Sequence, residues 1–136
     1  MQAKATKTRF QSMGRLPVVA VVDDDPAVCN SLEFSLQLEG FSVRAYGGAA
    51  ELFDAGNLAA FDCFVIDQRM RGISGMELIA TLRHRKVHAP AILLISHPSV
   101  ALSARAAEDG IPIVEKPLLG NTLVERIREA CERNRS

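Results

Sequence analysis

The sequence has no surplus of either charge and no apolar run long enough to cross a membrane. Its 136 residues include 16 Lys and Arg and 16 Asp and Glu, so a broad nucleic-acid or anionic-membrane surface is not indicated. The longest apolar stretches, Leu16–Val22 and Ala89–Ile95, are far shorter than the ~20 residues of a transmembrane helix. The N-terminus also lacks the apolar segment of a secretory signal. We expect a soluble, cytoplasmic protein that contacts no membrane.

Cysteine is scarce, and the three that occur are far apart in the chain. Cys29, Cys63 and Cys131 form no CxxC pair and no Cys/His spacing of the kind that binds zinc. Their odd number and wide separation also argue against a framework of disulfides. We expect buried or half-buried free thiols.

Length and composition predict one globular domain. A chain of 136 residues, 48% hydrophobic and 24% charged, can bury one core but is too short for two ordinary domains. Residues 1–16 carry several basic side chains and show no apolar periodicity. We expect a flexible, solvated tail at 1–16 and a folded domain at 17–133.

Short apolar runs alternate with segments of helical spacing along this domain. Continuous runs of β-branched residues are typical of strands that are buried on both faces of a sheet. Helix ends are indicated by the capping-box sequence that begins at Ser74 and by the terminating Gly40. The pattern predicts strands at 16–22, 41–46, 63–66, 91–95 and 111–114, and helices at 27–39, around Leu52 and Phe53, from Ser74 onward, at 100–109 and at 121–133.

The alternation of five strands with five helices predicts a mainly parallel sheet that is covered on both sides. With right-handed crossovers, the result is a doubly wound, three-layer α/β domain. The period-two pattern of residues 41–46 and the proline at 112 favour edge positions for the second and the fifth strand.

Acidic side chains follow two of the predicted strands. Asp23, Asp24 and Asp25 come directly after the first strand, and Asp67 ends the third. Ligands bind at the carboxyl ends of strands in open parallel sheets. If these two strands are neighbours, about 4.8 Å apart, their carboxylates share one basin. Mg²⁺ would relieve the repulsion between these carboxylates and leave coordination positions for water and a phosphate oxygen. Lys116, at the end of the fifth strand, could reach the same basin with its positive charge.

Such a set of groups suits the transfer of a phosphoryl group to a carboxylate. An aspartate can attack a phosphoryl donor in line while Mg²⁺ and a lysine neutralise the equatorial oxygens. Any one acidic strand end, taken alone, is more simply interpreted as the solvated start of a loop. The coincidence of four elements at matching strand ends favours the chemical interpretation.

Three segments of the chain resemble the signatures of response regulator receiver domains. They are Val-Val-Asp-Asp-Asp-Pro at 21–26, Val-Ile-Asp-Gln-Arg-Met at 65–70 leading to Gly75, and Glu-Lys-Pro at 115–117. The resemblance covers residues 17–133 and implies a flavodoxin-like sheet of strand order 2-1-3-4-5. It also implies a two-component signalling domain that a histidine kinase or a phosphotransfer protein phosphorylates in the presence of Mg²⁺. No enzymatic activity is implied beyond self-phosphorylation and self-dephosphorylation.

The resemblance assigns roles to the residues at matching positions. Asp67 is the expected phosphoacceptor, Asp24 a direct ligand of Mg²⁺, and Asp23 a ligand either directly or through water. The backbone carbonyl of Arg69 is expected to complete the metal site, and Lys116 to pair with the phosphoryl group.

Two neighbouring positions are interpreted in the same way. The peptide bond between Lys116 and Pro117 is expected to be cis, as in the family. Asp25 falls outside the acidic pair and is expected to face solvent or to cap the first helix.

The sequence departs from the receiver pattern where a hydroxyl and an aromatic ring are usual. Receivers carry Thr or Ser at the end of the fourth strand, a position that falls on Ile95. Ser96, one residue later, is the expected source of that hydroxyl; the alternative is that the contact is missing. Ile113 stands where an aromatic switch residue is usual, so the coupled movement of hydroxyl and ring is in question here.

The loops around the expected acceptor also differ from the pattern. Arg69 lies two residues beyond the acceptor Asp67, and His97 lies two residues beyond the hydroxyl position at 95. The simplest interpretation makes both of them solvated loop residues. Our hypothesis is that Arg69 contacts the phosphoryl oxygens and alters the access of hydrolytic water. A proline that is common near Arg71 is absent.

Two other functions remain open from the sequence. A degenerate receiver would keep the fold and act as an interaction module without phosphorylation, which Ile95 and Ile113 favour. A phosphatase of the haloacid dehalogenase type would use Asp23 and Asp25, but the residues expected after that motif and a late acidic pair are missing.

The expected partners follow from the receiver interpretation. They are the kinase or phosphotransfer protein, a downstream protein on the surface from the fourth to the fifth helix, and a second copy of the chain in a homodimer. Direct binding of nucleic acid is not expected, because no helix-turn-helix segment follows the last helix.

Overall fold

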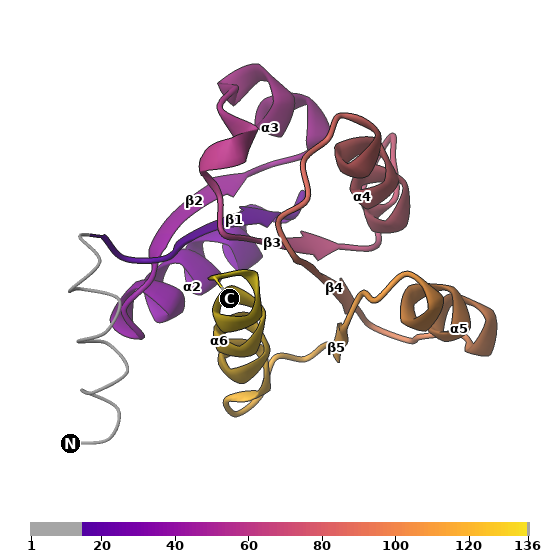
Figure 1. Ribbon diagram of the computed structural model, residues 1–136. Helices are drawn as coiled ribbons and strands as arrows, with labels where there is room; N and C mark the ends of the chain where they lie inside the picture. The colour runs from indigo at the N-terminus through magenta and orange to yellow at the C-terminus, as the bar shows by residue number, and fades with distance from the viewer. Residues whose placement is uncertain (1–14, 136) are drawn as a thin grey trace.

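The computed structural model describes residues 15–135, which form a five-stranded parallel sheet flanked by helices (Figure 1). The strand order is β2-β1-β3-β4-β5, which confirms the order that the receiver resemblance implies. Both strands predicted at the edges lie there. The strands are β1 (Val18–Val22), β2 (Ser42–Tyr46), β3 (Cys63–Asp67), β4 (Ala91–Ile95) and β5 (Ile113–Glu115).

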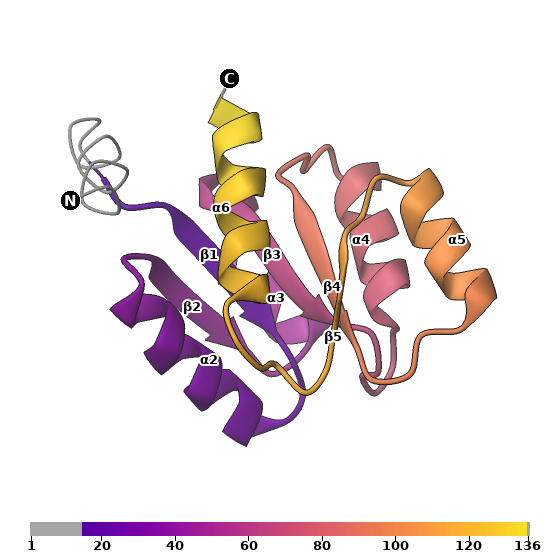
Figure 2. The ribbon, with the colours of Figure 1, turned by 90° about the horizontal axis from the view of Figure 1, so that it is seen from below.

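Helices cover both faces of the sheet, and this confirms the predicted three-layer α/β architecture. α2 and α6 pack on one face, and α3, α4 and α5 pack on the other (Figure 2). Their bounds are α2 (Pro26–Leu38), α3 (Ala49–Ala55), α4 (Gly75–His84), α5 (Val100–Glu108) and α6 (Thr122–Arg135), with a short 3-10 helix, η1 (Leu58–Ala60), that was not predicted. No helix within residues 15–135 is long and apolar enough to cross a bilayer.

The core explains why the strands are continuously apolar. In β1, Val19 and Val21 pack toward α2 and α6, whereas Ala20 and Val22 pack toward the other helical layer. Alternate residues of one strand therefore enter two separate apolar clusters, and neither face can carry a polar side chain without a partner. The three cysteines are buried and free, as predicted.

Local sequence signals set most of the helix ends. Ser74 and Glu77 form the predicted capping box, with each side chain accepting a hydrogen bond from the other residue's backbone N–H. Gly40 has a φ of 98° directly after the last residues of α2, a conformation that glycine adopts without strain. The predicted tail at 1–16 lies outside the described residues except for Arg15 and Leu16.

The last strand differs from its predicted position by one or two residues. It was expected at 111–114, but β5 spans Ile113–Glu115 because Pro112 has no N–H for the ladder. The carbonyl of Pro112 still accepts a hydrogen bond of 2.9 Å from the N–H of Leu93. This shift places Lys116 directly at the carboxyl end of the strand.

Candidate functional site

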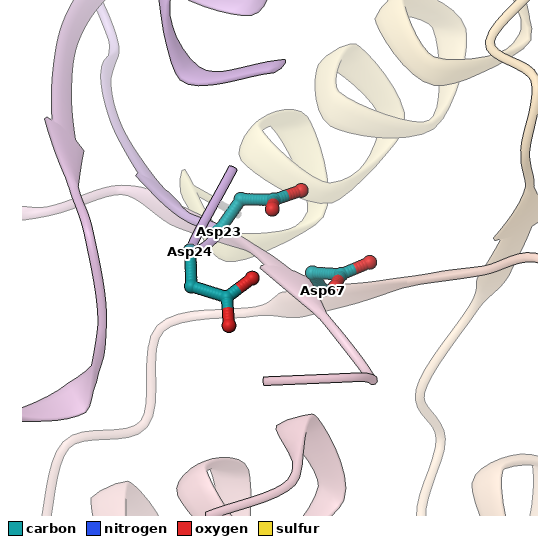
Figure 3. A group of neighbouring side chains, drawn as sticks. All are labelled: Asp23, Asp24 and Asp67. Carbon is teal, nitrogen blue, oxygen red and sulfur yellow. The ribbon is translucent and has the colours of Figure 1, made fainter. Parts of the chain in front are cut away.

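Three aspartates meet where the first and third strands end. Asp23 and Asp24 follow β1, and Asp67 is the last residue of the neighbouring β3, in which Ile66 pairs with Val22. One carboxylate oxygen of each aspartate lies within 4.8 Å of one oxygen of the other two (Figure 3). The parallel sheet thus brings together the carboxylates that the sequence placed at matching strand ends.

Lys116 joins two of these carboxylates from the end of the fifth strand. Its Nζ lies 2.8 Å from Oδ1 of Asp67 and 3.2 Å from Oδ2 of Asp23. The backbone N–H of Lys116 donates to the carbonyl of Ile95 at 2.9 Å and so holds this residue beside β4. The Lys116–Pro117 peptide bond is cis, as expected from the family.

The charges in this cluster shift one another's protonation. The pKa of Asp67 is raised, first by burial and also by the nearby charges of Asp23 and Asp24, although the hydrogen bond from Lys116 acts to lower it. For Lys116, burial acts to lower the pKa, but the hydrogen bond to Asp67 and the attraction of both carboxylates raise it overall. The lysine therefore stays charged, and its single charge does not offset the burial and the mutual repulsion of the carboxylates.

Asp23 and Asp25, at the end of β1, also accept hydrogen bonds from nearby backbone N–H groups. Oδ1 of Asp23, whose side chain is only 1% exposed, accepts from the N–H of Asp25 at 2.9 Å. Asp25 caps α2 by accepting from the N–H of Ala27 at 3.0 Å, which confirms its expected capping role. Asp25 is not one of the three clustered carboxylates.

Gly75 fixes the loop that follows Asp67. A Cβ at this position would lie 2.7 Å from the carbonyl oxygen of Asp67 and 2.7 Å from a methyl carbon of Leu93, so no side chain fits. The N–H of Gly75 donates to the carbonyl of Gln68 at 3.0 Å, and that of Met76 donates to the Gln68 side chain at 2.9 Å. The glycine of the second motif therefore serves close packing beside Asp67.

Arg71 makes a contact with Asp24 that the sequence interpretation missed. Its backbone N–H donates to Oδ2 of Asp24 at 3.1 Å, and its Nε lies 3.7 Å from the same oxygen. The only available signal was the absence of a proline near this position, since proline has no N–H to donate.

The cluster opens into a hollow of about 610 Å³ at the carboxyl ends of the strands. Ile95, the last residue of β4, is buried, whereas Ser96 is exposed one residue beyond the strand. Ser96, Arg69 and His97 all line this hollow together with Asp67. Ile113 is half-buried in β5, against the cluster that α4 and α5 cover.

The donor set fits a hard divalent cation. All three clustered side chains offer carboxylate oxygens, and Asp24 keeps 29% of its side chain exposed. Magnesium prefers a small number of carboxylates with other positions left to water and phosphate oxygen, and an open, oxygen-only cluster meets that requirement.

Comparison with known proteins identifies the family. The model of the response regulator receiver domain matches residues 19–128. The transcriptional regulatory protein FixJ of Azorhizobium caulinodans is 37% identical over 117 residues, which cover 85% of this chain and 56% of that protein. The C4-dicarboxylate transport transcriptional regulatory protein DctD of Pseudomonas aeruginosa is 35% identical over 115 residues, which cover 84% of this chain and 25% of that protein.

Solved structures show the same architecture. FixJ-N superposes with a TM-score of 0.71 and 31% identity, covering 85% of this chain and 94% of that one. A receiver domain protein from Clostridium thermocellum gives a TM-score of 0.81 at 23% identity, covering 88% and 98%, and supports the fold. The chain spans about half the length of the first curated relatives that it matches. It belongs to the response regulator receiver domain family, the family of the two-component response regulators.

Proposed function

We propose that Asp67 accepts a phosphoryl group from a phosphohistidine of a sensor kinase or of a histidine phosphotransfer protein. One observation carries this proposal: the Asp67 carboxylate lies beside Lys116 and two other aspartates and lines the hollow. Lys116 contacts Oδ1 of Asp67, and Oδ2 has no side-chain partner within residues 15–135. No fully buried side-chain oxygen in this part of the chain lacks a hydrogen-bond partner, so Oδ2 is not fully buried. Oδ2 therefore has access to solvent and can act as the nucleophile.

The transfer forms one bond and breaks one. An oxygen of Asp67 attacks the phosphorus atom, the P–N bond to the donor imidazole breaks, and the imidazole leaves with the bonding electrons and takes up a proton. The product is an acyl phosphate on Asp67. The charge of Lys116, which already contacts the acceptor, pairs with a phosphoryl oxygen during the transfer.

The divalent cation that fits the cluster is Mg²⁺, and Asp23, Asp24, Asp67 and the backbone carbonyl of Arg69 would hold it. When bound, it supplies positive charge that neutralises the phosphoryl oxygens. The Ser96 hydroxyl and the Arg69 side chain, which line the same hollow, are proposed to contact the phosphoryl group. Arg69 would then control the access of hydrolytic water.

The signal is proposed to leave through the surface formed by α5, β5 and α6. Here Ile113 lies at the sheet edge, next to a groove of about 430 Å³ between α5 and β5. Because no aromatic ring occupies this position, the change in docking surface has to come from repacking of aliphatic side chains. A downstream protein or a second copy of the chain would bind this surface.

Incubation with a small acyl phosphate and Mg²⁺, followed by intact-mass measurement, tests the proposal. We expect the mass increment of one phosphoryl group in the native protein, and its complete loss in Asp67→Asn or when a chelator removes the metal. The matched control is Asp54→Asn, which changes an exposed aspartate of α3 and should keep the increment.

The same experiment separates the alternatives. A folded native protein that never gains the increment would be the degenerate receiver, for which Ile95 and Ile113 are the sequence evidence. Steady hydrolysis of a generic phosphomonoester that survives Asp67→Asn would instead support the phosphatase of the haloacid dehalogenase type.

A further inference from the structure

The loop after β3 brings a second cation to the aspartate cluster. We propose that Arg71 is a counter-ion of Asp24 that opposes the binding of a divalent cation, so that this one side chain sets the metal affinity of the site. The inference rests on the proposed function, because it concerns the same cluster. It assigns to Arg71 a role in tuning the metal site and not in the chemical step.

The first argument is how the carboxylates are already paired. Lys116 bridges Asp23 and Asp67, at 3.2 and 2.8 Å, and within residues 15–135 it forms no ion pair with Asp24. Arg71 supplies the positive charge for Asp24, with its Nε 3.7 Å from Oδ2. Each of the three carboxylates therefore has a cationic side chain beside it.

The second argument is that both contacts of Arg71 fall on one oxygen. The backbone N–H of Arg71 donates to Oδ2 of Asp24 at 3.1 Å, and the guanidinium approaches that same atom. The N–H orients the carboxylate through a neutral dipole, whereas the guanidinium adds a full charge. A dication that binds Asp24 gains from the first contact and is repelled by the second.

The third argument is accessibility. The side chain of Asp24 is 29% exposed, against 1% for Asp23 and 8% for Asp67, so Asp24 is the member of the cluster that solvent reaches most easily. A hydrated cation approaching the cluster meets Asp24 and the guanidinium of Arg71 together. The cation and the Arg71 guanidinium therefore compete for the Asp24 carboxylate, the most exposed of the three.

The expected size follows from exposure. The Arg71 side chain is 92% exposed, so water and salt screen its charge strongly. An exposed ion pair is weak, but the repulsion acts on a doubly charged ion, and we expect Arg71 to weaken Mg²⁺ binding by about three- to tenfold at low salt. A proline near this position, as is common in the family, would provide neither the charge nor the N–H.

Calorimetric titration with Mg²⁺ alone, without any phosphodonor, tests the inference. The variants are Arg71→Ala, Arg71→Lys and, as a charge-matched control, Arg105→Ala, an exposed arginine of α5. All of them keep the backbone N–H at 71; Arg71→Ala removes the side-chain charge there, whereas Arg71→Lys keeps it. We expect Arg71→Ala to lower the Kd for Mg²⁺ by about three- to tenfold, and Arg71→Lys and Arg105→Ala to remain close to the native value.

Salt provides a second readout that a purely structural role would not give. Repeating the titration at ~1 M ionic strength, where the Debye length is about 3 Å, should bring the Kd values of Arg71→Ala and the native protein together. A Kd for Arg71→Ala that equals or exceeds the native value at low salt would overturn the inference. If instead the native protein and Arg71→Ala both fail to bind Mg²⁺, the metal site of the proposed function fails, and the two failures are thereby distinguished.

Discussion

Strand β3 carries a buried aspartate at each end, and the two are held in opposite ways. Asp62, directly before the strand, accepts from both terminal nitrogens of Arg15, at 2.6 and 3.0 Å, and from the N–H of Val18 at 2.7 Å. Asp67, at the other end, has one oxygen bonded to a lysine that it shares with Asp23. Both are less than a tenth exposed, so burial alone does not distinguish them.

The difference lies in how completely each charge is paired. Asp62 binds a guanidinium with both oxygens, and this hydrogen bond is the main reason that the pKa of Arg15 is raised. The pKa of Asp67 is raised mainly by burial. The hydrogen bond from Lys116 acts to lower this pKa but offsets the rise only in part. A fully paired buried aspartate serves the fold, whereas a partly paired one beside other carboxylates is available for metal binding and chemistry.

Removing the paired aspartate should have the larger effect on stability. Asp62→Ala leaves the N–H of Val18 and the guanidinium of Arg15 without this acceptor, and we expect the free energy of unfolding to fall by about 2–3 kcal/mol. Urea unfolding followed by circular dichroism measures this change. Because the site lies at the other end of the strand, the fraction of folded protein that takes up the phosphoryl group should not change.

Arg15→Ala is the control for that variant. The arginine side chain is half exposed and the N–H of Val18 keeps its acceptor, so the expected loss is about 1 kcal/mol or less. Equal losses for the two variants would mean that the bond to Val18 contributes nothing, and the distinction between the two ends of β3 would weaken.

Neutralising the partly paired aspartate should have a smaller effect of opposite sign. Since the pKa of Asp67 is raised in the folded state, the folded protein holds this proton more tightly than the unfolded chain does. Ionisation of Asp67 therefore costs stability as the pH rises through and above its usual pKa of 3.8. At pH 7 we therefore expect Asp67→Asn to increase the free energy of unfolding and to raise the Tm.

The pH dependence of this gain checks its cause. The Tm difference between Asp67→Asn and the native protein should be smallest near pH 4 and should grow toward pH 7. A stabilisation that is constant with pH would come from packing, and a destabilisation at pH 7 would show that Lys116 compensates Asp67 fully.

The fold was predictable because its signals are local. The apolar runs of β1, β3 and β4, the capping box at Ser74 and the glycine after α2 each act within a few residues, and the structure places these elements within two residues of the predicted bounds. The convergence of the acids also followed from the sequence, because parallel strands share one carboxyl edge. The strand order itself came from the family resemblance.

The contacts that were missed join residues 47 positions apart in the chain. Arg15 pairs with Asp62, and Arg71 with Asp24, through side chains whose directions depend on loop conformation. Arg15 in particular was placed in a solvated tail, because a basic residue without apolar periodicity carries no local sign of a partner. Hydroxyl chemistry at Ser96 stays a prediction, since the strand ends at the preceding Ile95.

The central claim is that Asp67, and no other aspartate, takes the phosphoryl group. Tryptic cleavage places Asp23 and Asp24 in the peptide 16–44, and Asp62 and Asp67 together in the peptide 45–69. Borohydride reduction of the phosphorylated protein converts the modified aspartate to homoserine, and fragment-ion masses then locate it. We predict homoserine at position 67 alone; homoserine at 23, 24 or 62, with residue 67 unchanged, would contradict the account.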